Sequence, residues 1–107
     1  MAETEIRVVL CTCPADHAER VAQTLLEERL VACVNIVGGV RSLYWWKDAI
    51  ASDVESMLVI KAPAARYAAL EARLTEVHPY EVPEILSLEV VDGSRSYMAW
   101  VREAALC

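Results

Sequence analysis

Hydrophobic residues in the first third of the chain change from a continuous run to a helical spacing, which predicts a strand followed by a helix. The apolar run at 6–12 has the length and the β-branched content of a strand that is buried on both faces. From Asp16 to Leu30, apolar residues recur every three or four positions, as in an amphipathic helix. Asp16 and Glu19 have the spacing of a capping box, so we expect the helix to begin there.

The middle of the chain has the pattern of a long, bent hairpin. Strand character returns at 31–46, where Gly38 and Gly39 predict a bulge. The polar stretch at 47–53 predicts the connection to a third strand at 54–61. We therefore expect two consecutive antiparallel strands with a bend in the first of them.

The last third of the chain predicts a helix, a strand and a further helix. Pro63 suits the first turn of a helix whose apolar stripe closes before Pro79. A strand at 84–91 and a turn at 92–94 then lead to the terminal helix. The order β-α-β-β-α-β plus a helix predicts an α+β fold, the ferredoxin-like split β-α-β sandwich, with an antiparallel sheet and two helices on one face. We expect one domain over 1–107.

Trp45 and Trp46 predict an oligomer, because neighbouring residues of a strand point to opposite faces of a sheet. Both indoles cannot therefore lie beneath the two helices. An exposed indole leaves on the order of 200 Å² of apolar surface in water, so we expect neighbouring subunits to cover it. In the alternative, Trp100 and the last helix cover the spare indole within one chain.

Composition supports burial of apolar surface against other protein. The 107 residues are 56% hydrophobic, and the mean hydropathy of +0.29 is high for a soluble domain. No apolar run approaches the ~20 residues that a membrane helix requires, and the chain starts with acidic residues rather than a basic signal sequence. The net charge of −6 argues against nucleic acid as a partner. We expect neither membrane nor nucleic-acid binding.

Cysteine usage indicates a reducing compartment. The four cysteines, Cys11, Cys13, Cys33 and Cys107, form no CxxC pair, so a zinc finger or a thioredoxin-type site is not expected. Cys11 and Cys13 are two residues apart and project to the same side of a strand. They are either a pair of ligands for a soft metal or, as is more common, small hydrophobic core residues. We expect a cytoplasmic protein.

The segment 78–85 carries the densest group of functional side chains. It places an imidazole, a phenol and carboxylates between two prolines, Pro79 and Pro83, which stiffen the backbone on both sides. Such a segment suits a binding site, and it equally suits a rigid turn whose polar groups face water. No nucleophile with a partner base and no glycine-rich phosphate loop is found, so we expect no catalytic activity.

Four strings occur in order along almost the whole chain. They are 30–36, 42–46, Glu55 followed by 57–61, and the highly specific 78–85. Together they resemble the CutA family of divalent-cation tolerance proteins. The resemblance implies a ferredoxin-like homotrimer, akin to PII-type signalling proteins. It also implies a cytoplasmic role in tolerance to copper and other divalent ions, with no established catalytic activity.

The same resemblance implies the site residues. Copper in bacterial members is attributed to a cysteine of the first strand and to two adjacent histidines; Cys11 and His78 match two of these ligands, and Val77 stands in place of the third. Cys13 or Glu84 are candidates to compensate. We expect a binding cleft between subunits, lined by Trp46, Glu55, Lys61, Tyr80 and Glu84. The alternative function is a PII-like signalling or scaffold trimer that binds a small ligand or a partner protein in this cleft.

Overall fold

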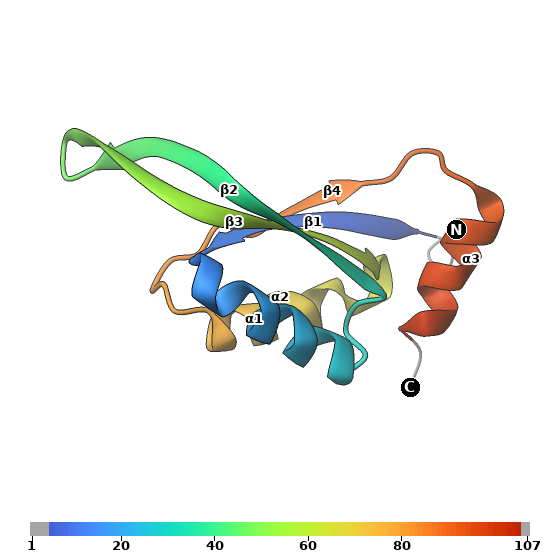
Figure 1. Ribbon diagram of the computed structural model, residues 1–107. Helices are drawn as coiled ribbons and strands as arrows, with labels where there is room; N and C mark the ends of the chain where they lie inside the picture. The colour runs from blue at the N-terminus through green and yellow to red at the C-terminus, as the bar shows by residue number, and fades with distance from the viewer. Residues whose placement is uncertain (1–4, 106–107) are drawn as a thin grey trace.

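The computed structural model describes residues 5–105, so that Cys107 and the acidic start at 1–4 lie outside the described residues. Strands and helices alternate as the sequence pattern predicts (Figure 1). The elements are β1 (Ile6–Cys13), α1 (Ala15–Glu27), β2 (Cys33–Trp46), β3 (Ala49–Pro63), the 3₁₀ turn η2 (Ala64–Arg66), α2 (Tyr67–Val77), β4 (Leu86–Glu89) and α3 (Arg95–Ala104). No helix within these described residues is long and apolar enough to cross a membrane.

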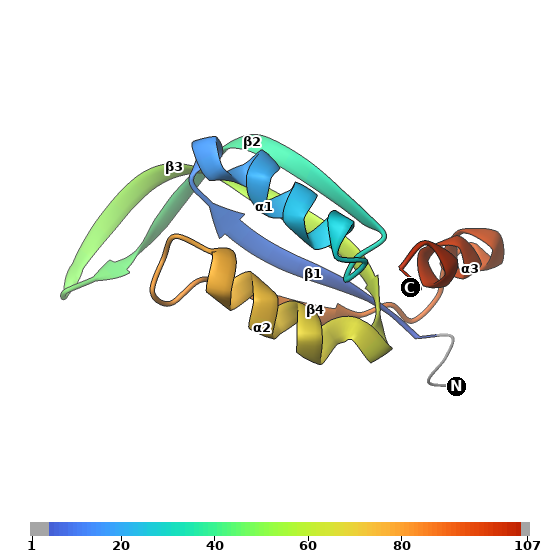
Figure 2. The ribbon, with the colours of Figure 1, turned by 90° about the horizontal axis from the view of Figure 1, so that it is seen from below.

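The four strands form one antiparallel sheet in the order β2-β3-β1-β4. Helices α1 and α2 cover one face of it, and α3 lies at one end (Figures 1 and 2). This arrangement confirms the ferredoxin-like prediction. The core lies between the sheet and the two helices, because one set of alternating strand residues points toward them. Its main members are Val9, Cys11 and Cys13 of β1, Leu58 and Ile60 of β3, Leu25 of α1, and Leu70 and Leu74 of α2.

Within residues 5–105, no helix layer covers the other face of the sheet. The register pairs Leu86 with Leu10 and Leu88 with Val8, and these residues alternate with the core residues of β1. Leu86 and Leu88 remain 54% and 47% exposed. The expectation that the first strand is buried on both faces is therefore met on one face only within a single chain.

The β2–β3 hairpin is longer than predicted and extends beyond the helices (Figure 1). Its turn consists of Lys47 and Asp48 alone, with φ values of 51° and 64°, and β3 begins directly at Ala49. Two residues of positive φ form the tight turn that matches the twist of paired strands. The predicted connection at 47–53 is therefore wrong, because polar residues there belong to a strand whose faces both reach solvent.

The predicted bulge in the hairpin is confirmed. The pairing of β2 with β3 shifts in register between Val37 and Val40, and Gly39 has a φ of 70°. Both tryptophans of the hairpin lie on the far side of this bend and are exposed, Trp45 at 73% and Trp46 at 61%. The alternative in which the last helix covers an indole is wrong, because α3 lies at the opposite end of the molecule from the hairpin turn (Figure 1).

Several element ends differ from the sequence prediction. Helix α1 has Pro14 at its N-cap with no side-chain hydrogen bond, so the capping box is not formed. Pro63 ends β3 and precedes η2, and α2 begins only at Tyr67. The fourth strand is shorter than the predicted 84–91 and spans Leu86–Glu89. Helix α2 ends at Val77, before Pro79, as predicted.

Candidate functional site

Segment 78–85 links α2 to β4 and is attached to the sheet through His78. The imidazole is 6% exposed, and its Nε2 lies 2.8 Å from the Thr12 carbonyl oxygen at the end of β1. Its Nδ1 lies 3.0 Å from the backbone nitrogen of Tyr80. An amide nitrogen can only donate, so Nδ1 accepts and Nε2 carries the proton that it donates to Thr12. Both nitrogens of a neutral imidazole are thus occupied.

Tyr80 attaches the same segment to β3. Its hydroxyl donates a hydrogen bond of 2.8 Å to Oε2 of Glu55, a side chain that is only 7% exposed. Burial raises the pKa of the Tyr80 phenol, and the hydrogen bond and charge of Glu55 raise it further. Tyr80 therefore stays protonated and serves as the donor. The His78 and Tyr80 rings lie 4.9 Å apart between centroids, so the segment is held as one unit.

Cys11 lies beside this attachment, on the core side of β1. Its thiol is fully buried, with Sγ 3.7 Å from the same Thr12 carbonyl oxygen. Burial raises the pKa of Cys11 to about 12, and the neighbouring Cys13, Glu84 and Glu55 add to the shift. Burial is also the main cause of the raised pKa of Cys13. Both side chains are therefore protonated thiols at neutral pH.

The two predicted metal ligands, Cys11 and His78, share one neighbourhood because both contact the Thr12 carbonyl oxygen. A thiolate and an imidazole suit copper, and two ligands suffice for its monovalent form. Both donors are engaged in other interactions, however, and coordination requires each to be released. Among residues 5–105, no cluster of three or more His, Cys, Asp or Glu side chains is placed to hold a metal ion.

The predicted cleft residues fall into two groups. Glu55, Tyr80 and Glu84 lie near Cys11, as their contacts and their effect on its pKa show. Lys61 is six residues away from Glu55 along β3, about 20 Å, and its ammonium group donates to the Asn35 side chain. Trp46 occupies the far end of the hairpin. A single chain therefore does not bring Trp46 and Lys61 into the site.

Sequence reasoning missed a second phenol–carboxylate pair, Tyr44 with Asp53. The Tyr44 hydroxyl donates a hydrogen bond to Asp53, which is the main cause of the raised pKa of this phenol. Both residues also raise the pKa of Tyr80, so the two pairs are neighbours. The pair was not expected because 47–53 was predicted to be a loop. The alternation of Asp53 and Glu55 on one strand face is the signal that identifies it.

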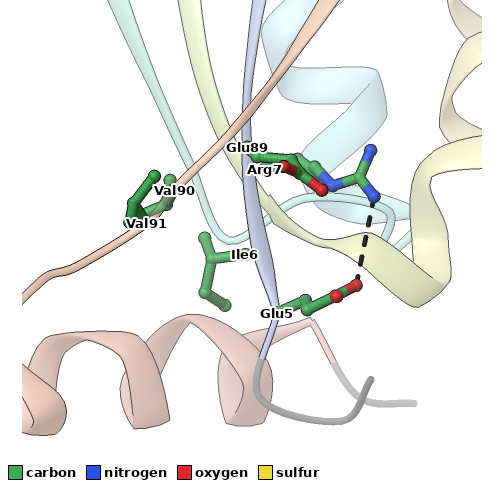
Figure 3. Close-up of a pocket in the computed structure, with 6 residues that line it drawn as sticks. All are labelled: Glu5, Ile6, Arg7, Glu89, Val90 and Val91. Carbon is green, nitrogen blue, oxygen red and sulfur yellow. Dashed lines mark ion pairs between the residues drawn. The ribbon is translucent and has the colours of Figure 1, made fainter. Parts of the chain in front are cut away.

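A separate hollow lies at the other end of β1 and contains none of the predicted site residues (Figure 3). Its volume is about 190 Å³. Figure 3 shows Arg7 directed toward Glu5, with 4.0 Å between Nη2 and Oε1, on the opposite side from Val90 and Val91. The guanidinium thus serves an ion pair within the chain, and the network at His78 is the better candidate site. The hollow is lined by Glu5, Ile6, Arg7, Glu89, Val90 and Val91.

Comparisons with known proteins agree on one family. The model of the CutA1 divalent ion tolerance protein matches residues 7–104. The divalent-cation tolerance protein CutA of Thermus thermophilus is 43% identical over 97 residues, which is 90% of this chain and 94% of that protein. Both names describe tolerance to divalent ions, and neither of them states a reaction.

Two solved structures have the same fold. The PII-like protein CutA from Nostoc has a TM-score of 0.89 and 36% identity, with 94% of this chain and 97% of that chain covered. The periplasmic divalent cation tolerance protein CutA from Archaeoglobus fulgidus has a TM-score of 0.91 and 28% identity, with 94% and 99% covered. With a family model that matches nearly its whole length, the chain belongs to the CutA1 divalent ion tolerance protein family.

Proposed function

We propose that the protein acts in the tolerance of cells to divalent metal ions and binds copper through Cys11 and His78. The family and the name of the Thermus relative support the role. The observation that carries the copper site is the Thr12 carbonyl oxygen, which both the thiol and the imidazole contact. On coordination, the Cys11 thiol releases its proton to solvent, because the thiolate is the ligand.

The copper site is tested by titration calorimetry with monovalent copper under reducing conditions. His78→Ala is expected to weaken binding at least about tenfold, because one of two ligands is lost. His17→Ala is the matched control, since His17 is the other histidine of the chain and contacts Asp16 in α1. Unchanged affinity in His78→Ala, with the assembly preserved, would remove His78 from the site.

The proposed assembly is a homotrimer, which the two free sheet edges and the open sheet face support. β2 forms one edge of the sheet and β4 forms the other. Unpaired edges of different strands favour a heterologous contact, which closes into a ring when it repeats. The exposed indoles of Trp45 and Trp46 add apolar surface that a neighbour can cover. Sedimentation at nanomolar concentration tests this, and folded single subunits with shielded indoles contradict it.

In the proposed trimer, the binding cleft is completed between subunits. Glu55, Tyr80 and Glu84 of one subunit form its base, and the distant Trp46 and Lys61 reach it from neighbouring copies. The reach of the hairpin beyond the helices supports this arrangement (Figure 1). Mixed assembly of Lys61→Ala chains with Glu55→Gln chains tests this arrangement. Ligand binding should be retained only at clefts whose Glu55 comes from a Lys61→Ala chain and whose Lys61 comes from a neighbouring Glu55→Gln chain.

The alternative function is a PII-like signalling or scaffold trimer. The Nostoc structure, which is described as a PII-like protein, favours it. Both functions use the same cleft, so the ligand distinguishes them. Titration with copper, zinc and a nucleotide panel, followed by tryptophan fluorescence, is the test. Stoichiometric copper binding supports the metal function, and a nucleotide-dependent change supports the alternative.

The proposed compartment is the cytoplasm, although the Archaeoglobus relative is described as periplasmic. Cys11, Cys13 and Cys33 are all free thiols, which suits a reducing environment. Fractionation of the source cells with immunodetection is the test. Recovery of the protein with periplasmic markers contradicts the proposal.

A further inference from the structure

The network at His78 is closed toward any ion. The His78 imidazole uses Nε2 for Thr12 and Nδ1 for the Tyr80 amide, so neither nitrogen has a lone pair free for a metal. The Cys11 side chain is fully buried. An ion from solvent therefore cannot reach either donor while these contacts persist. Some part of the site must move before it binds.

Segment 78–85 carries the His78 donor and lies outside the helices and strands. Val82 within it is 86% exposed, whereas Ile85 at its end packs against the core. Two side-chain hydrogen bonds join the segment to the sheet, His78 to Thr12 and Tyr80 to Glu55. The Tyr80 amide also bonds the His78 ring, so the imidazole cannot leave Thr12 without disturbing the position of Tyr80. The Tyr80–Glu55 contact is the outer of the two bonds, because Tyr80 is 38% exposed whereas His78 is 6% exposed.

We propose that the hydrogen bond from Tyr80 to Glu55 is a latch that keeps Cys11 and His78 closed, so that opening of segment 78–85 controls access to the pair. This inference deepens the proposed copper function and rests on the same residues. A bond to a charged acceptor that is largely buried is among the stronger hydrogen bonds of a protein. The open fraction is therefore small, and the apparent dissociation constant is the intrinsic one divided by that fraction.

The latch is tested without metal by the alkylation rate of Cys11. Tyr80→Phe keeps the ring and removes the hydroxyl donor, so the open fraction and the alkylation rate should rise about tenfold or more. Site-resolved mass spectrometry separates Cys11 from the other cysteines. Glu55→Gln keeps an acceptor oxygen and should give a smaller increase than Tyr80→Phe. Tyr97→Phe removes a phenol that contacts Cys33 in another region, and it should leave the Cys11 rate unchanged.

A general loss of stability is distinguished by Val101→Ala. Val101 is fully buried in a separate small cluster with Ile6 and Ala32, away from the latch. If Tyr80→Phe acts by unfolding alone, Val101→Ala of equal stability will raise the Cys11 rate equally, and the latch is refuted. A rate in folded Tyr80→Phe within twofold of the parent rate also refutes it.

Copper affinity then separates the latch from the proposed function. A parallel rise of the Cys11 alkylation rate and of copper affinity in Tyr80→Phe supports both. A rise in alkylation alone supports the latch and removes the copper pair. Copper binding that depends on His78 but, like the alkylation rate, does not change in Tyr80→Phe supports the site and refutes the latch.

Discussion

His78 acts as a connector because its two nitrogens have different partners. The ring accepts from the Tyr80 amide and donates to the Thr12 carbonyl, 66 residues away in the chain. One neutral imidazole therefore fixes the path of a segment that has no regular secondary structure. A glutamine at this position lacks the ring geometry that satisfies both partners. Within the chain, His78 therefore holds segment 78–85 against the end of β1.

Burial of the Cys11 thiol makes the free energy of unfolding decrease at alkaline pH. Its pKa is about 12 in the folded chain against 9.0 for an unperturbed thiol, because burial disfavours the thiolate. The folded state therefore holds the proton more tightly. The resulting stability is fully present below about pH 9 and is lost as the pH rises toward 12. The stability difference between the parent chain and Cys11→Ala should shrink by up to about 1.4 kcal/mol per pH unit in this range.

Denaturant unfolding at a series of pH values from 7 to 12 checks this prediction. The difference between the two chains isolates the ionisation of Cys11 together with its coupling to Cys13, because the other cysteines, the tyrosines and the lysines titrate in both chains. A difference that stays constant across the range would mean that the Cys11 thiol is no harder to ionise in the folded chain than in the unfolded one.

At the scale of elements, the end of α1 shows how a helix can stop without glycine. Leu30 N donates to Leu25 O and Arg29 N donates to Leu26 O, which is the Schellman arrangement with Arg29 in the left-handed position at a φ of 59°. The sequence pattern extended this helix to Leu30, because Leu30 is indeed buried. Leu30 lies in the C-terminal cap and not in a further helical turn, and its side chain reaches the core from there. No glycine marks the stop, so periodicity alone could not place it.

Arg29→Gly should be more stable than Arg29→Ala by about 1 kcal/mol. Both variants lose the bond from the Arg29 guanidinium to the Ala104 carbonyl, so their difference isolates the cost of a side chain at positive φ. Thermal and chemical denaturation of the two variants measures it. Equal stabilities, or a more stable alanine variant, would contradict the left-handed assignment.

The hairpin turn offers a second prediction at this scale. Lys47 and Asp48 both have positive φ, which Asn and Gly adopt more readily in a two-residue turn. Replacement of the pair by Asn-Gly should therefore stabilise the protein by about 1 kcal/mol. Ser52→Gly is a suitable control, because it adds a glycine to the same hairpin within β3 and should destabilise it. A lower melting temperature for the Asn-Gly variant would contradict the prediction.

The element order was predictable from sequence, whereas the long-range contacts of the site were not. Periods of two and of three to four residues follow directly from the geometry of strands and helices, so the fold could be inferred. The local string at 78–85 identified His78 and Tyr80. Their partners Thr12 and Glu55 lie far away in the chain, and only the folded structure shows which residues meet. Lys61 lies six residues from Glu55 along β3, a separation that the family strings did not reveal.

At the scale of the whole molecule, the sheet has one face buried beneath the helices and one half-exposed apolar face. The core residues of β1 point to the helices, and their neighbours Val8 and Leu10 point to the open face beside Leu86 and Leu88. Apolar surface of this extent supports the proposed association with other subunits. The high mean hydropathy of +0.29 is consistent with the proposed trimer, in which three sheets would share an interior.

Leu88→Lys should therefore dissociate the proposed trimer and leave the subunit fold intact. Leu88 is 47% exposed in the single chain and contributes little to the core beneath the helices, but a lysine in a shared interior would be a buried, unpaired charge. Leu26→Lys is the matched control, since Leu26 is 38% exposed on α1, and α1 covers the other face of the sheet. Sedimentation velocity at micromolar concentration should give single subunits for Leu88→Lys and trimers for Leu26→Lys. Trimers for both would mean that the open face takes no part in assembly, and dissociation of both would point to the helical face instead.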